Sequence, residues 1–313
     1  MSRADHSPAA GPAPAAHDTN AFRRLLVAVD DSDAAGAAAS FAIWLAGTAG
    51  ADVTLLHACP DLQSAQHAPP MADPAAFRAA AEHRLAETTE WQRRLKNIED
   101  YAVAGARVKS WVVRGRPASA VLDAATELDS DVILIGSRGL GSTRARLLGS
   151  VSSQVVDHAR CSVMVFPARQ ESSPAHIASV IVGVDGSPGA APAIAAGTTL
   201  ASALDARLVL LTAFESPTAL TPPTDLPARL QRDAERVLAT ARASVPADIE
   251  VVEQLRAGPP RQMLLAAGER FGPSVLVVGT RGLGGFRGLL LGSTSRSILH
   301  DASCPVLVAR RPS

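Results

Sequence analysis

The chain contains an internal repeat, and this repeat limits its possible folds more than any other feature. "LLVAVDDS" at residues 25–32 matches "VIVGVDGS" at residues 180–187, and "GRPASAVLDAA" from Gly115 matches "GPPRQMLLAAG" from Gly258. The first pair is 155 positions apart and the second 143, so the first copy holds twelve additional residues between Ala58 and Gly115. We expect this chain of 313 residues to fold as two similar domains, each with its own core.

Each copy alternates short apolar runs, rich in Val, Ile and Leu, with helical stretches. Continuous apolar runs are typical of parallel strands that are covered on both faces. We therefore expect an α/β fold of two tandem doubly wound domains, each with a five-stranded parallel sheet in the flavodoxin-like or Rossmann-like order 3-2-1-4-5. The expected strands are residues 24–30, 52–58, 107–113, 131–136 and 161–166 in the first copy and residues 179–185, 206–213, 249–255, 274–279 and 304–309 in the second.

Residues at the expected helix starts agree with this pattern. Ser32 and Ser187 precede Ala-rich stretches, and we expect each to be the N-cap of the first helix in its copy. Pro117 and Pro260 lie where the first turn of a helix tolerates a missing N–H group.

A glycine-rich stretch follows the fourth expected strand of each copy: "GSRGLGSTRARLLGS" at residues 136–150 and "GTRGLGGFRGLLLGS" at residues 279–293. Glycine has no Cβ, so a bulky ligand can approach the backbone there. Gly-Ser then opens the last helix, where unpaired amide N–H groups and the positive end of the helix dipole favour an anion. Arginines add positive charge nearby; they are Arg138, Arg144, Arg146, Arg281 and Arg287.

The bland alternative for this stretch is a tight turn with solvated arginines. Two copies that hold the spacing G-x2-G-x9-G-S in register favour a phosphate site, because a turn alone constrains fewer positions. The stretch is not a dinucleotide fingerprint, which would follow the first strand, and the chain has no G-x-x-x-x-G-K-S/T motif.

The combined pattern resembles the universal stress protein family. In both copies the first strand ends in Asp, the second ends in an apolar residue, and G-x2-G-x9-G-S follows the fourth. The resemblance covers nearly the whole chain and is to the tandem, two-domain, ATP-binding type. It implies a first universal stress domain at residues 22–168 and a second at residues 178–311. From their composition we expect residues 1–21 to be a disordered tail and residues 169–177 to be a linker.

The resemblance also implies two sites for ATP. Adenine and ribose contacts would fall at the ends of the first two strands of each copy, and phosphates would lie on the glycine-rich stretch, with Mg²⁺ held mostly by phosphate oxygens. The implied residues are Ala28, Asp30, Ala58, Gly136, Arg138, Gly139, Gly141, Gly149, Ser150 and Val151 in the first copy, and Gly183, Asp185, Ala213, Gly279, Arg281, Gly282, Gly284, Gly292, Ser293 and Thr294 in the second. No catalytic residue and no protein metal ligand is implied.

The first copy departs from the family pattern after its first strand. It has Asp30-Asp31-Ser32-Asp33 where the second copy has Asp185-Gly186-Ser187. The extra carboxylates could repel a polyphosphate or help to recruit a cation. We favour the alternative in which Asp31 and Asp33 stabilise the start of the following helix through its dipole.

Other candidates for chemistry are weaker. His57 lies near the implied adenine pocket, but its counterpart is Thr212, so we expect a local hydrogen bond rather than catalysis. The three cysteines lack metal-ligand spacing and are expected to be small buried residues. Trp91 is expected to turn inward from an Arg-rich helical stretch.

Composition excludes several classes of partner. Thirty Lys and Arg balance thirty Asp and Glu, and aromatics make up 4% of residues, so nothing favours nucleic acid. No apolar run approaches the roughly 18 residues that cross a bilayer. The first twenty residues lack the apolar centre of a secretory signal, so we expect a cytoplasmic protein.

These observations favour an ATP-binding stress-response regulator, with an adenine nucleotide and an unidentified protein as partners. The resemblance implies that the last strands join the two copies as an internal pseudo-dimer, and we expect homodimerisation as well. One alternative is a slow ATPase or nucleotidyl-transfer enzyme, although no general base recurs in both copies apart from Asp30 and Asp185. Another is a nucleotide-free dimerisation module.

Overall fold

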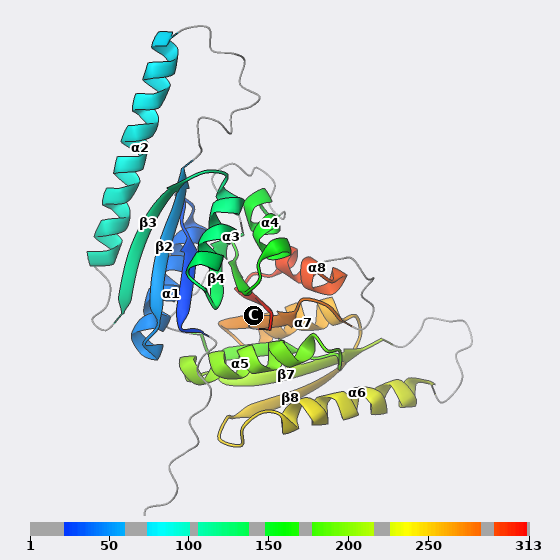
Figure 1. Ribbon diagram of the computed structural model, residues 1–313. Coiled ribbons are helices and arrows are strands. Elements are labelled where there is room, and N and C mark those ends of the chain that lie inside the picture. Colours follow the sequence, from blue (N-terminus) through cyan, green and yellow to red (C-terminus); the bar gives the residue numbers. More distant parts are fainter. Residues whose placement is uncertain are drawn as a thin grey trace, which may run out of the picture.

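A computed structural model describes residues 22–59, 74–100, 106–137, 148–168, 177–215, 226–282 and 291–311 (Figure 1). We call residues 22–168 the first half and residues 177–311 the second half. The expected tail, and the expected linker apart from Ile177, lie outside the described residues.

The two halves repeat one order of elements. The first half consists of β1 (Arg24–Ala28), α1 (Asp33–Ala49), β2 (Asp52–Cys59), α2 (Pro74–Asp100), β3 (Arg107–Arg114), α3 (Pro117–Glu127), β4 (Val132–Gly136), α4 (Ser150–His158) and β5 (Ser162–Phe166). The second consists of β6 (Ser179–Gly183), α5 (Ala190–Leu204), β7 (Arg207–Phe214), α6 (Leu226–Ala243), β8 (Val251–Ala257), α7 (Pro260–Arg270), β9 (Ser274–Gly279), α8 (Ser293–Asp301) and β10 (Val306–Ala309).

The strands form one sheet of ten, in the order β3-β2-β1-β4-β5-β10-β9-β6-β7-β8. Within each half every pairing is parallel, and the first half has the expected order 3-2-1-4-5. At the centre β5 and β10 pair antiparallel, with Leu307 opposite Met164. The predicted fold class is therefore confirmed, including the pairing of the two domains through their last strands.

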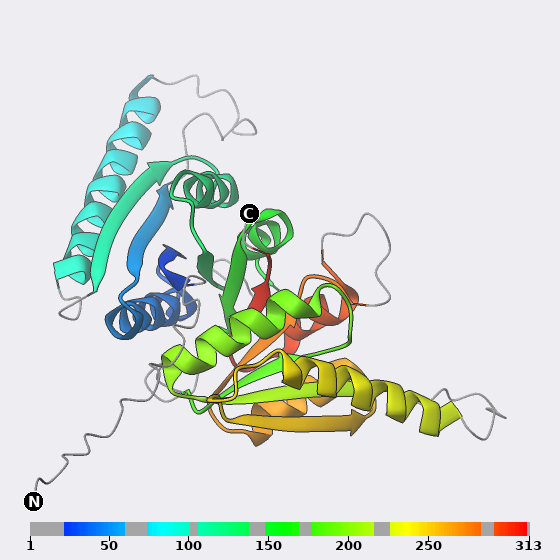
Figure 2. The same cartoon turned by 60° about the horizontal axis from the view of Figure 1, so that its bottom comes forward.

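Helices cover both faces of this sheet (Figures 1 and 2). Alternate residues of a strand enter opposite cores: Leu25 and Val27 belong to the core that includes residues of α1, α2, α5 and α6, whereas Leu26 belongs to the core that includes residues of α3, α4, α7 and α8. Strands that are buried on both faces explain the unbroken apolar runs in the sequence. Among the described helices none is both long and apolar enough to cross a membrane.

Polar contacts reinforce the junction between the halves. Arg296 on α8 donates to Asp157 on α4 at 2.7 Å. The Arg310 backbone N–H donates to the Ser162 hydroxyl at 3.1 Å, and its guanidinium donates to the Val156 carbonyl. Burial lowers the pKa of Arg310, because the charged form loses solvation at the junction.

The additional residues of the first half lie in and before its second helix. Helix α2 has 27 residues and α6 has 18. Figure 1 shows α2, in cyan, running beside β3 at one end of the sheet, and α6, in yellow, beside β8 at the other.

Three expectations about helix starts are confirmed and one is wrong. Pro117 and Pro260 occupy the first turns of α3 and α7, and the Ser32 hydroxyl accepts a hydrogen bond from the Ala35 N–H as the N-cap of α1. Ser187 is not an N-cap, because α5 begins at Ala190. The Ser187 hydroxyl instead donates a hydrogen bond to the Arg281 carbonyl, at 3.2 Å. A contact between residues 94 positions apart overrides the local signal here.

Strand ends differ from expectation by one or two residues. Strand β10 begins at Val306 rather than at residue 304, and Pro305 directly before it has no N–H to donate to a ladder. Strand β8 runs from Val251 to Ala257 rather than over residues 249–255.

Candidate functional site

Each half has a crevice at the carboxyl ends of its parallel strands, where ligands of doubly wound sheets bind. The crevice of the second half has a volume of about 460 Å³ and that of the first half about 160 Å³. Only the larger one falls within the roughly 300–1,000 Å³ of ordinary small-molecule pockets. We call them the second-half crevice and the first-half crevice.

The second-half crevice brings together nine of the ten residues that the resemblance implied for this copy. They are Gly183, Asp185, Ala213, Gly279, Arg281, Gly282, Gly292, Ser293 and Thr294. The tenth, Gly284, lies outside the described residues, as does Arg287. The described lining therefore combines the Asp185 carboxylate, the Arg281 residue and a helix start on an apolar floor.

The start of α8 forms one end of this crevice. Gly292 is the N-cap, with extended backbone and no side-chain cap, so the N–H groups of the first helical turn have no capping partner from Gly292. The Gly292 N–H donates to the Thr280 carbonyl at 2.7 Å, and the Ser295 hydroxyl donates to the Gly279 carbonyl at 2.8 Å. These two bonds fix the helix start against the end of β9, with its positive dipole end beside the cavity.

Close backbone packing explains two glycines beside this helix. A Cβ on Gly279 would lie 2.4 Å from the Gly189 carbonyl oxygen, and a Cβ on Gly189 would lie 2.4 Å from the Arg281 carbonyl oxygen. We expected glycine after β9 to make room for a ligand, but at Gly279 it makes room for the turn before α5. Its φ is outside the left-handed region, so conformational freedom is not the reason.

Gly282 faces the carboxylate of the crevice. A Cβ on Gly282 would lie 2.4 Å from Asp185 Oδ2. The other carboxylate oxygen, Oδ1, accepts a hydrogen bond from the Ser187 N–H at 3.0 Å, which orients the side chain. The absence of a side chain at residue 282 thus keeps Asp185 accessible from the glycine-rich stretch.

The floor of the second-half crevice contains residues that sequence analysis missed. Pro260 and Leu264 contribute from α7, and Leu211 and Val278 from the strands. A Cβ on Gly183 would lie 3.0 Å from Leu264 Cδ1. The first half carries the complementary pair, Ala28 with Val121. The signal for Leu264 was the apolar position one turn after Pro260, which looked like ordinary core.

The first-half crevice repeats the same framework. The Ser152 hydroxyl donates to the Gly136 carbonyl at 2.6 Å, and the Gly149 N–H donates to the Ser137 carbonyl at 2.7 Å. Of the implied residues, Ala28, Asp30, Ala58, Gly136 and Val151 line the crevice. Gly149 is the N-cap of α4 and Ser150 its first residue; neither is among the described lining residues, and Arg138, Gly139 and Gly141 lie outside the described part of the chain.

An aromatic stack adjoins the first-half crevice through His57, which is one of its lining residues. The imidazole of His57 stacks on the Trp91 indole with ring centroids 3.8 Å apart, and His57 Nδ1 lies 2.7 Å from the Val29 carbonyl oxygen. Burial is the main influence on His57 and lowers its pKa, which favours the neutral form of the ring. The expectations of an inward Trp91 and of a local hydrogen bond for His57 are both confirmed.

The extra carboxylates of the first half lie outside its crevice lining. Asp31 pairs with Arg94 of α2, whose guanidinium carbon lies 4.8 Å from the Trp91 ring centroid. Asp33 is in the first turn of α1, where its charge favours the helix dipole. Among the described residues no group of three or more His, Cys, Asp or Glu could hold a metal ion.

The cysteines are free thiols. Burial raises the pKa of Cys59 and Cys304, and it raises that of Cys161 to about 11. Thiols of this kind are protonated at pH 7 and are poor nucleophiles.

Comparison with known proteins agrees with this architecture. The sequence model of the Universal stress protein family matches residues 21–167 and again residues 177–310. Universal stress protein Rv2623 of Mycobacterium tuberculosis is 32% identical over 304 residues, which cover 93% of this chain and 97% of that protein. Universal stress protein Rv2005c of the same organism is 33% identical over 209 residues, covering 65% of this chain and 69% of that one.

Solved structures show the same fold. The crystal structure of a universal stress protein from Archaeoglobus fulgidus aligns with a TM-score of 0.65 at 21% identity, covering 93% of this chain and 98% of that chain. A protein of unknown function from Pseudomonas aeruginosa, PA1789, aligns with a TM-score of 0.62 at 16% identity, covering 94% of each.

Proposed function

The chain belongs to the universal stress protein family, and from this premise we propose that it is an adenine-nucleotide-binding regulator whose principal site is the second-half crevice. One observation carries the proposal. A single cavity of about 460 Å³ holds the start of α8, the Arg281 residue, the Asp185 carboxylate and an apolar floor. These are the chemical groups that a phosphorylated nucleoside requires.

Each end of the crevice suits one part of such a ligand. Amide N–H groups at Ser293 and Thr294 would donate to phosphate oxygens, as helix starts do for anions. The Asp185 carboxylate would accept hydrogen bonds from ribose hydroxyls, as acidic residues do in nucleotide sites of related topology. The apolar floor around Leu264 and Ala213 would cover the face of the adenine ring.

Magnesium would be held mainly by the phosphates of the bound nucleotide. The described residues offer no cluster of three ligands for a metal ion. A divalent cation is therefore expected to bind with ATP and not in its absence.

A regulator acts through a change in population. A nucleotide that binds one arrangement of the glycine-rich stretch more tightly than another shifts the chain toward that arrangement, by no more than the difference in affinity. The Ser187 hydroxyl, which donates to the Arg281 carbonyl, connects this stretch to the turn before α5. Through this hydrogen bond, binding of a nucleotide in the crevice would change the position of the turn before α5.

The test is equilibrium dialysis of the full chain against ATP, ADP and AMP with and without Mg²⁺. The variant Gly282→Val places a branched side chain against Asp185 Oδ2, and we expect ATP affinity to fall by about tenfold or more, equal to roughly 1.4 kcal/mol. Gly36→Val is the matched control, because a Cβ at Gly36 meets no atom within 4 Å. Unchanged ATP affinity in a folded Gly282→Val chain would exclude the second-half crevice as the principal site.

A further inference from the structure

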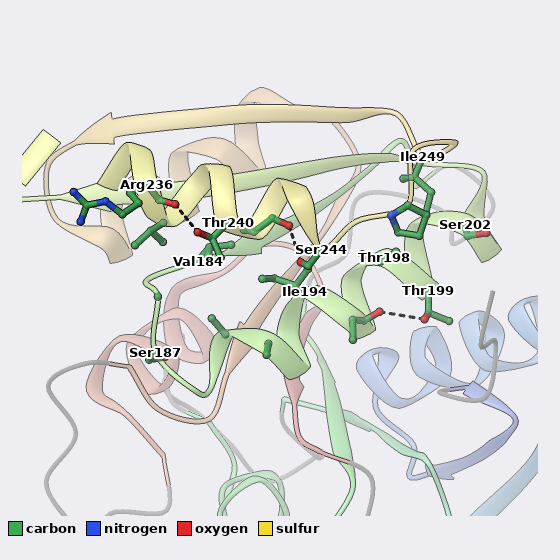
Figure 3. Close-up of a pocket in the computed structure, with 17 residues that line it drawn as sticks. Val184, Ser187, Ile194, Thr198, Thr199, Ser202, Arg236, Thr240, Ser244 and Ile249 are labelled. Carbon is green, nitrogen blue, oxygen red and sulfur yellow. Dashed lines mark hydrogen bonds between the residues drawn. The ribbon is translucent and has the colours of Figure 1, made fainter. Parts of the chain in front are cut away.

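A third cavity lies on the other side of the turn that precedes α5. It is a groove of about 600 Å³ between α5 and α6, within the volume range of small-molecule sites. Figure 3 shows Ile194, Thr198 and Thr199 on one wall and Arg236, Thr240 and Ser244 on the other. We call it the α5–α6 groove.

The internal repeat explains why this groove exists. Four lining positions of the second half carry smaller side chains than their first-half counterparts: Thr198 for Ile43, Thr199 for Trp44, Val237 for Arg94 and Ala241 for Ile98. Ile43, Trp44 and Ile98 all pack against the core of the first half. The Trp44 ring centroid lies 6.2 Å from that of Phe41. In the first half, therefore, an indole ring is built into the chain at the position that Thr199 leaves open.

The lining of the groove favours a neutral occupant. Among its seventeen described lining residues, Arg236 alone is charged, and its guanidinium already donates to Asp233 at 3.0 Å. Alanine, valine, isoleucine and proline side chains make up much of the rest. A charged ligand would lose solvation here without an available opposite charge in the described lining.

Hydroxyl groups supply acceptors on both walls. The hydroxyls of Thr199, Thr240 and Ser244 donate to helix carbonyls at 3.1, 2.8 and 2.7 Å, which leaves their oxygens able to accept. The Thr198 hydroxyl oxygen is buried and has no hydrogen-bond partner among the described residues. A ligand with an N–H or O–H group could donate a hydrogen bond to one of these hydroxyl oxygens.

We propose that the α5–α6 groove is a second small-molecule site, which binds a neutral planar aromatic compound with one hydrogen-bond donor. Such a compound reproduces the indole of Trp44, which the first half carries covalently. The site is separate from the second-half crevice but adjoins it, because Val184, Ser187 and Ala190 line both cavities.

Indole is the probe for this proposal, in calorimetric titrations of the full chain. We expect one saturable site per chain. Thr199→Trp copies Trp44 and fills the groove with its own ring, so indole affinity should fall by about tenfold or more. Ala239→Trp is the matched control, because residue 239 is exposed on α6 and does not line the groove. It should bind indole as the unmodified chain does.

Two further variants separate this site from the nucleotide crevice and from misfolding. Gly282→Val should lower the affinity for ATP and leave the affinity for indole unchanged. Thr199→Trp should lower the affinity for indole and leave the affinity for ATP unchanged. Thr198→Ile, a smaller change that copies Ile43, should also weaken indole if Thr199→Trp fails to fold.

Three results would overturn the proposal. The first is no saturable indole binding by the unmodified chain. The second is indole binding that Gly282→Val abolishes and Thr199→Trp retains, which would place indole in the adenine pocket. The third is concentration-dependent self-association that Thr199→Trp abolishes without any indole binding, which would assign the groove to a second copy of the chain.

Discussion

Gly183 and Leu264 show how two residues shape the floor of the second-half crevice. Gly183 leaves room for the Leu264 side chain, whose Cδ1 would lie 3.0 Å from a Cβ added at Gly183. In the first half the strand position carries Ala28, which is larger than Gly183, and the helix position carries Val121, which is smaller than Leu264. The two halves thus keep a similar total side-chain volume but divide it differently between strand and helix.

This complementarity makes a prediction about stability. Gly183→Ala should lower the free energy of unfolding by about 1–2 kcal/mol, because overpacking forces Leu264 to shift. The double variant Gly183→Ala, Leu264→Val copies the first half and should recover most of that loss. Urea denaturation followed by circular dichroism measures both. Equal losses in the single and double variants would show that the contact with Leu264 is not the cause.

At the scale of elements, the start of α8 is the part of the second-half crevice that would face the phosphates of the proposed nucleotide. The Ser295 hydroxyl bonds to the Gly279 carbonyl and fixes the helix to the end of β9. Ser152 makes the equivalent bond to Gly136 in the first half. Because both serines are buried, each bond is expected to contribute about 1 kcal/mol to stability.

The matched pair separates stability from binding. Ser295→Ala and Ser152→Ala should each lower the free energy of unfolding by about 1 kcal/mol. Only Ser295→Ala should also lower the affinity for ATP, by about threefold to tenfold, because it removes the bond that fixes the start of α8 at the proposed principal site. Dialysis against ATP measures the second effect. A larger loss of ATP affinity in Ser152→Ala would assign the principal site to the first half.

The elements themselves could be predicted because they depend on local pattern. Apolar runs located the ten strands of the described residues to within two positions. Of the repeated glycines, Gly136 lines the first-half crevice, and Gly279, Gly282 and Gly292 line the second-half crevice. Contacts between distant segments could not be predicted. Ser187 was predicted to be an N-cap, but its hydroxyl donates a hydrogen bond to the Arg281 carbonyl. Leu264 looked like core, and only the packing of α7 against Gly183 places it in the crevice.

The α5–α6 groove was also invisible in the sequence. Thr198, Thr199 and Ala241 are unremarkable residues for a helix, and neither their spacing nor their type predicts a cavity. The cavity becomes evident only when each position is compared with its larger counterpart in the first half.

At the scale of the whole molecule, the duplication produces two domains that share one continuous sheet. Strands β5 and β10, each an edge of its own half, meet at the centre and cover each other's unpaired backbone groups. The two crevices occupy equivalent places in the two halves but differ in size and surroundings. The first-half crevice is small and has the His57–Trp91 stack beside it, while the second-half crevice is open at about 460 Å³.

The most direct test of the account is a crystal structure of the full chain at a saturating concentration of ATP and Mg²⁺. We predict density for the nucleotide in the second-half crevice, with phosphates at the N–H groups of Ser293 and Thr294 and a ribose hydroxyl at Asp185. A second-half crevice without nucleotide, or phosphates held away from the start of α8, would contradict the account.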